Sequence, residues 1–85
     1  MERKEIETLV KAFLEEDMEI DAALIVNEAL LRDDLGLDSL DFVDIVVIVE
    51  KTFGFKIKPE EMAAVQTVDE FCNYIYLKTT AQTAQ

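Results

Sequence analysis

The chain has 85 residues, 51% of them hydrophobic and 32% charged, with a net charge of −11 at pH 7. This length fits one domain, and the apolar share is large enough for a core, which excludes a chain disordered through low hydrophobicity. The negative charge excludes nucleic-acid binding, which needs Lys and Arg to neutralise phosphates, and it disfavours anionic membrane surfaces.

The first predicted element is an amphipathic helix near the N-terminus. Its apolar residues recur every three or four positions, which is the spacing of one helical face. They are Ile6, Leu9, Val10, Phe13 and Leu14. Residues 17–37 carry acids, short apolar clusters and Gly36, and we expect a long loop with one turn of helix. A loop of this length is uncommon in a small domain and indicates a functional or cross-bundle connection.

Residues 40–53 could form a strand or a helix. The β-branched run at 45–49 favours a strand by propensity alone. The apolar pattern is too long for a typical strand, however, and Asp38 and Ser39 before it are helix-capping residues. Gly54 follows as a C-terminal stop. We therefore predict a helix.

Two further helices are expected. Pro59-Glu60-Glu61 opens a short one, since proline is favoured in the first turn. Thr67 and Glu70 form a capping box that starts the last helix. The apolar face of that helix holds Val68, Phe71, Cys72, Ile75 and Tyr76. The predicted fold is all-α, a small four-helix bundle of three main helices plus one short helix, with one domain over residues 1–78 and a disordered polar tail over 79–85.

The net charge is concentrated in one stretch. Residues 12–50 hold twelve acids against a single base, Arg32, and so carry all of the −11, while acids and bases balance elsewhere. The acids could form a solvated surface that only aids solubility, or a face directed at basic patches of other proteins.

The residues available for catalysis are few. The chain has no histidine, so a Ser–His or Cys–His pair is impossible, and the spacing around both glycines fails the EF-hand pattern. Cys72 lies on an apolar helical stripe, which favours an inert core residue over a reactive thiol. We predict that the protein is not an enzyme and holds no metal.

Two sequence features bear on the cellular compartment of the protein: the charge of the N-terminal residues and the length of the apolar runs. The charged residues 1–5 predict no signal peptide, and no apolar run exceeds the five residues 45–49, too few to cross a bilayer. One cysteine cannot form an internal disulfide. We expect a cytoplasmic protein without membrane insertion.

Ser39 stands between two acids at the start of the second main helix. It could be only a helix cap, since serine is a favoured cap residue. The same helix carries two apolar stripes, which a small bundle can hardly bury together. One stripe could face the core and the other a partner, although the second could also be core. The first is Phe42, Ile45, Val46, Val49 and Phe53, and the second is Leu40, Val43 and Val47.

The segment Leu35-Gly36-Leu37-Asp38-Ser39-Leu40-Asp41 resembles the signature of acyl carrier proteins. The likeness continues through Phe53, Ile57, Pro59-Glu60-Glu61 and Val65 to the Thr67-Val68 helix start, and covers roughly residues 4–78. The resemblance implies phosphopantetheine attached covalently to Ser39, added by a phosphopantetheinyl transferase. Its thiol would hold acyl groups as thioesters, so that the protein acts as a carrier and does no chemistry itself.

The resemblance also implies roles for other residues. Asp38 matches the acid before the modified serine, and a role in orienting the transferase's magnesium follows from the family. The residues expected to line an acyl-chain pocket are Ile45, Val46, Val49, Phe53, Met62 and Val65. The residues expected to bind acyl-transfer and ketosynthase-type enzymes through their basic patches are Leu40, Asp41, Val43, Asp44, Val47 and Glu50. A monomer is expected.

Some positions depart from the family pattern. Phe42 is bulky, Arg32 puts a base in the loop before the serine, and Pro59 lies one place later than usual. These departures leave fatty-acid biosynthesis, a polyketide or polyene pathway and lipid modification open as pathways. The alternative function is a small acidic helical adaptor, which would bind basic proteins without a prosthetic group.

Overall fold

The computed structural model describes residues 2–83, with side chains described up to Thr80. Helix α1 runs over Arg3–Glu16, a 3-10 turn (η1) over Ala22–Leu24, α2 over Ser39–Phe53, α3 over Pro59–Ala63 and α4 over Val68–Thr83. The described residues contain no strand, only an isolated bridge between Leu30 and Thr67. The prediction of an all-α bundle with three main helices and one short helix is confirmed.

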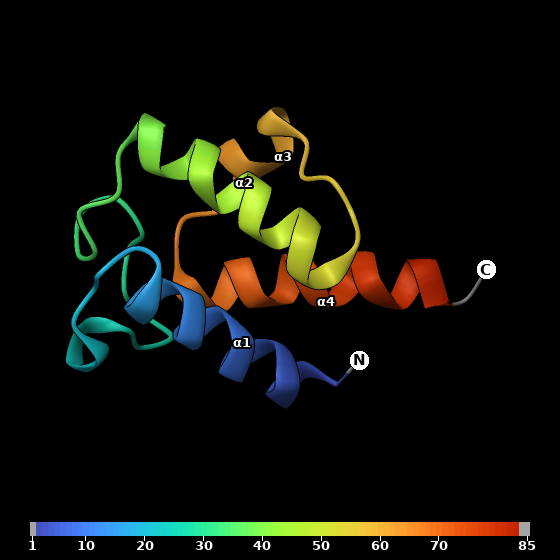
Figure 1. Cartoon of the computed structure of the whole chain (residues 1–85), viewed down its shortest axis with the longest axis horizontal. Coiled ribbons are helices and arrows are strands. Elements are labelled where there is room, and N and C mark those ends of the chain that lie inside the picture. The colour runs from blue at the N-terminus through green and yellow to red at the C-terminus, as the bar shows by residue number, and fades with distance from the viewer. Residues whose placement is uncertain (1, 84–85) are drawn as a thin grey trace.

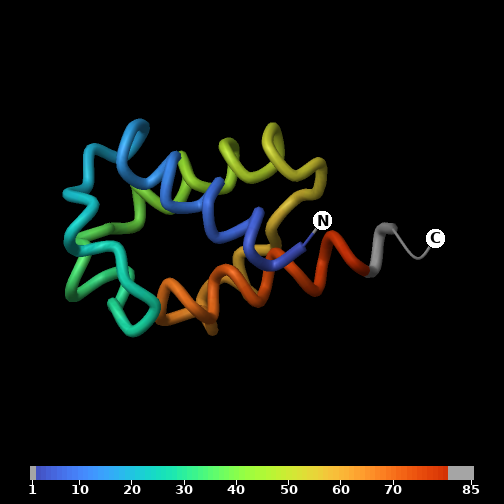
Figure 2. The backbone as a smooth tube through the Cα atoms, turned by 90° about the horizontal axis from the view of Figure 1, so that it is seen from below, coloured from blue at the N-terminus to red at the C-terminus, as the bar shows by residue number. Residues whose placement is uncertain are grey.

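The three long helices surround one core (Figure 1). The loop between α1 and α2 closes one end of the molecule, and α4 extends toward the other end (Figures 1 and 2). Each long helix contributes apolar residues to the core at helical spacing. The buried apolar residues of the three are Ile6, Val10, Phe13, Leu14, Ile45, Val49, Phe53, Val68, Phe71, Cys72 and Ile75. The rings of Phe13 and Phe71 meet edge to face, with centroids 6.2 Å apart, and join α1 to α4.

The long loop is an ordered part of the core. Leu31, Leu35 and Leu37 are buried in it, and its backbone is hydrogen-bonded to the start of α4. The Leu31 N–H donates to the Gln66 carbonyl over 2.8 Å, and the Val68 N–H donates to the Ala29 carbonyl over 3.0 Å. This anchoring fixes the position of the segment that leads into Ser39.

The helix ends are as the sequence predicts, with one exception. Gly54 ends α2 in the left-handed conformation, with φ at 81°, and Thr67 and Glu70 form the predicted capping box. Helix α4, however, continues past the expected start of the polar tail at residue 79 and reaches Thr83. Thr79 is buried because it lies on the same face as Cys72 and Ile75. Residues 84 and 85 lie outside the described residues.

The core contact of Phe71 gives a stability prediction. We expect Phe71→Ala to lower the free energy of unfolding by about 3–5 kcal/mol, because it leaves a cavity beside Phe13. Urea denaturation followed by far-UV circular dichroism measures this. Leu77→Ala on the same helix is the matched control, since Leu77 is 59% exposed, and should change stability by less than about 0.5 kcal/mol. Equal losses in the two variants would contradict this packing.

Candidate functional site

The start of α2 is fixed by two aspartates. The Asp38 Oδ1 accepts a hydrogen bond from the Asp41 N–H over 3.0 Å, and the Asp41 Oδ2 accepts one from the Asp38 N–H over 3.1 Å. This reciprocal pair is a capping box with Asp38 as the N-cap. Both carboxylates also place negative charge at the positive end of the helix dipole.

Ser39 is therefore the first residue of the helix and not its cap. It is exposed, and its hydroxyl makes no hydrogen bond with any residue in the part of the chain that the structure describes. The hypothesis that Ser39 serves only as a helix cap is wrong, because Asp38 already supplies that interaction. An exposed hydroxyl at a fixed position remains open to modification.

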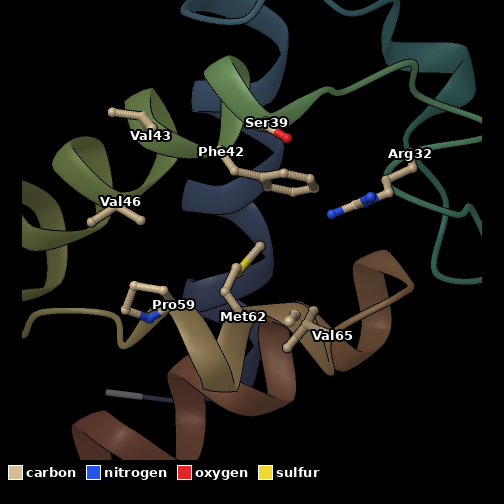
Figure 3. A pocket seen from close by; sticks show the side chains of 9 residues that line it. Arg32, Ser39, Phe42, Val43, Val46, Pro59, Met62 and Val65 are labelled. Carbon is tan, nitrogen blue, oxygen red and sulfur yellow. The ribbon is translucent and has the colours of Figure 1, made fainter.

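A cavity of about 250 Å³ opens beside Ser39. It lies between α2, α3 and the loop before α2, and Figure 3 shows the Ser39 hydroxyl and the Phe42 ring at one side, with Met62 and Val65 facing them. Its lining is Arg32, Ser39, Phe42, Val43, Val46, Pro59, Met62, Ala63 and Val65. A mostly apolar pocket with few polar groups is typical of a small-molecule site.

Only half of the expected pocket residues line this cavity. Val46, Met62 and Val65 do, whereas Ile45, Val49 and Phe53 do not; these three are buried in the core on the inner face of α2. Phe42 and Val43 were not expected there. Their positions could have been found from the sequence, since Ser39, Phe42, Val43 and Val46 are spaced i, i+3, i+4 and i+7 and therefore share a helical face.

The second apolar stripe of α2 faces solvent. The exposed fractions of Leu40, Val43 and Val47 are 77%, 61% and 46%, and Asp44 and Glu50 beside them are exposed as well. The alternative that this stripe is core is thus excluded. Five of the six expected partner-binding residues therefore lie on the solvent-exposed face of α2. Asp41, the sixth, is half-buried and engaged in the capping box.

Helix α3 forms the far wall of the cavity and is held by α4. The Tyr74 hydroxyl donates to the Glu61 Oε1 over 2.7 Å, and the Lys78 Nζ lies 3.1 Å from the same oxygen. Burial and this hydrogen bond raise the pKa of Tyr74 to about 12, while the same contacts lower the pKa of Glu61. The Tyr74 hydroxyl is protonated at neutral pH, so that it and Lys78 tie Glu61 of α3 to α4.

Cys72, the free cysteine of the described residues, was also considered as a reactive group. Cys72 is buried, and desolvation raises the pKa of its thiol to about 11, which agrees with an inert core residue. The described residues contain no cluster of His, Cys, Asp or Glu placed to hold a metal ion. Among them, too, no helix combines the length and the apolar character that crossing a bilayer requires.

Comparison with known proteins gives a consistent result. The family described as phosphopantetheine attachment site matches residues 8–75. The acyl carrier protein of Thermotoga maritima is 40% identical over 76 residues, covering 89% of this chain and 94% of the relative. The acyl carrier protein of Thermosynechococcus vestitus is 35% identical over 95% of this chain and all of the relative, and that of Rubrobacter xylanophilus is 33% identical over the same shares.

The different roles of Asp38 and Ser39 can be separated by their effects on stability. We expect Asp38→Ala to lower the free energy of unfolding by about 1 kcal/mol, because the Asp41 N–H loses its acceptor. Ser39→Ala should change it by less than about 0.5 kcal/mol, because no hydrogen bond is lost. Urea denaturation of the unmodified protein measures both. A larger loss for Ser39→Ala than for Asp38→Ala would show that the serine is the cap.

Proposed function

The chain belongs to the acyl carrier protein family, whose members bind phosphopantetheine, and we propose that Ser39 is the residue that carries the prosthetic group here. The protein is a carrier and not an enzyme. The observation that supports Ser39 is its exposed hydroxyl, which has no hydrogen-bond partner among the described residues and lies at the mouth of an apolar cavity.

The surroundings of Ser39 fit a phosphodiester. A phosphate on its Oγ would lie at the N-terminus of α2, where the helix dipole favours an anion. In the attachment step, the Ser39 Oγ forms a bond to the pantetheine-bearing phosphorus of coenzyme A. The bond from that phosphorus to adenosine 3′,5′-bisphosphate breaks, and the serine proton passes to a base of the transferase. Once attached, the arm supplies a terminal thiol that holds acyl groups as thioesters.

Asp38 can serve the same step without losing its structural role. Its Oδ1 accepts the hydrogen bond from Asp41, whereas its Oδ2 accepts none within the described residues. We assign to this second oxygen the orientation of the transferase's magnesium ion, for which a carboxylate oxygen is a suitable ligand.

The cavity beside Ser39 is the proposed site for the acyl chain. Phe42, Val46, Met62 and Val65 give it apolar walls, so that an alkyl chain bound there is removed from water. Ile45, Val49 and Phe53 lie behind this wall in the core.

The outer face of α2 is the proposed surface for partner enzymes, which are acyl-transfer and ketosynthase-type enzymes and the transferase. Leu40, Val43 and Val47 would bury apolar area, while Asp44 and Glu50 would meet basic patches and speed the encounter. The rest of the acidic stretch extends this negative field over residues 12–50. The proposal includes a monomeric carrier, because this face must stay open to successive enzymes.

The adaptor without a prosthetic group is the weaker candidate. It would use the same outer face of α2, but it gives no role to the Ser39 hydroxyl or to the cavity beside it. The two functions differ in whether Ser39 becomes modified, which a direct measurement decides.

Attachment at Ser39 is tested by intact mass. After incubation with coenzyme A and a broad-specificity transferase, the protein should gain the mass of one phosphopantetheine, and Ser39→Ala should gain none. Thr52→Ala, which removes another exposed hydroxyl of α2, is the control and should be modified like the parent. A gain that persists in Ser39→Ala would exclude Ser39, and no gain in any variant would favour the adaptor.

Partner binding is tested by charge reversal on α2. We expect the double variant Asp44→Lys, Glu50→Lys to associate with the transferase about tenfold more slowly at low salt, because electrostatic steering is lost. Stopped-flow fluorescence with a labelled transferase measures the association rate constant. Glu15→Lys, Glu16→Lys makes the same charge change on α1 and should have a much smaller effect. Equal effects would mean that net charge, and not the face of α2, controls association.

A further inference from the structure

Arg32 is the one base among the acids of residues 12–50, and it lies at the cavity beside Ser39. It is also the only charged residue among those that line this cavity. Figure 3 shows its guanidinium extending from the loop before α2 into the same space that the Ser39 hydroxyl faces, on the side of Phe42. A cation is thus held next to the proposed attachment point.

The guanidinium is positioned by an aromatic ring and not by a carboxylate. It lies 5.4 Å from the centroid of the Phe42 ring, a cation–π contact. Two aspartates follow it in the chain, yet Arg32 makes no ion pair within the part of the chain that the structure describes. Asp34 is engaged elsewhere, since its Oδ2 accepts a hydrogen bond from the Leu30 N–H over 2.7 Å. The hydrogen-bond donors of Arg32 are therefore available to a ligand in the cavity mouth.

The group proposed for Ser39 brings an anion to this place. Its phosphodiester carries a negative charge and would stand close to the carboxylates of Asp38 and Asp41, which are fixed by the capping box. Like charges in proximity repel one another. Arg32 is the only cation of the acidic stretch, and a guanidinium matches phosphate oxygens geometrically.

We propose that Arg32 binds the phosphodiester on Ser39 and holds the first atoms of the arm against the mouth of the cavity. This inference rests on the proposed function, because it requires the prosthetic group on Ser39. Bound in this way, the arm is directed over Phe42 into the cavity and not outward into solvent. Arg32 is then a positioning residue that favours the sheltered state of the acyl chain, and high salt weakens its hold by screening the contact.

The test uses the protein loaded with octanoyl-phosphopantetheine. The octanoyl group has no charge, so the phosphodiester is the only anion on the arm. Hydroxylamine cleaves an exposed thioester faster than a sheltered one, and intact mass gives the rate. We expect Arg32→Gln to be cleaved about three- to tenfold faster than the parent at low salt, and the ³¹P chemical shift of the phosphodiester to change. The two cleavage rates should converge at 1 M salt, where the Debye length is about 3 Å.

Two variants separate charge at this position from other effects. Lys51→Gln removes one positive charge from an exposed position of α2 outside the cavity and should leave both the rate and the ³¹P shift unchanged. Arg32→Met keeps a long apolar stem without the charge and should behave like Arg32→Gln. Two results would overturn the inference. One is an equal rate of thioester cleavage in Arg32→Gln and Lys51→Gln, and the other is a thioester in Arg32→Met that is cleaved as slowly as in the parent. A chain that takes up no prosthetic group would overturn the proposed function as well, whereas equal rates in loaded protein leave that function standing.

Discussion

The reciprocal hydrogen bonds between Asp38 and Asp41 determine where α2 begins, and the geometry of the site depends on that point. They satisfy two backbone N–H groups that a helix start would otherwise leave without partners. Because the cap is made by aspartates on either side, the serine between them keeps an exposed hydroxyl. In a regular helix, the direction in which each side chain points follows from its position after the first residue. The start of α2 therefore determines which of its later residues face the core, the cavity or solvent.

Helix α2 thus has three faces with different roles, which point toward the core, the cavity and solvent. Ile45, Val49 and Phe53 are buried in the core and contribute to stability through the removal of apolar area from water. Phe42 and Val46 border the cavity next to Ser39, and Leu40 and Val47 face solvent. A single helix thereby joins the core, the proposed acyl-chain site and the proposed partner surface. The loop before it is hydrogen-bonded to the start of α4, and this anchoring keeps Arg32 and Ser39 at the cavity.

Much of this arrangement follows from the sequence, because periodicity and capping residues define helices well. The β-branched run at 45–49 still forms a helix, since the caps at both ends and the long apolar pattern outweigh strand propensity.

The depth at which each side chain is buried was harder to predict. The stripe of α2 shows which residues face inward but not where the cavity ends and the core begins, and the family resemblance, which implies Ile45, Val49 and Phe53 as pocket residues, does not separate the two either. Asp38 and Ser39 are both good caps one residue apart, and only the hydrogen bonds identify Asp38. The extension of α4 depends on the tertiary burial of Thr79, which a polar sequence does not indicate.

The central claim is that the cap and the attachment point are different residues. The most direct measurement is NMR spectroscopy of the protein before and after it receives phosphopantetheine. The account predicts a three-bond coupling from phosphorus to the β-protons of Ser39, together with an Asp41 amide whose hydrogen exchange is equally slow in both states. Coupling of phosphorus to another residue, or loss of the Asp41 protection once Ser39 is modified, would contradict it.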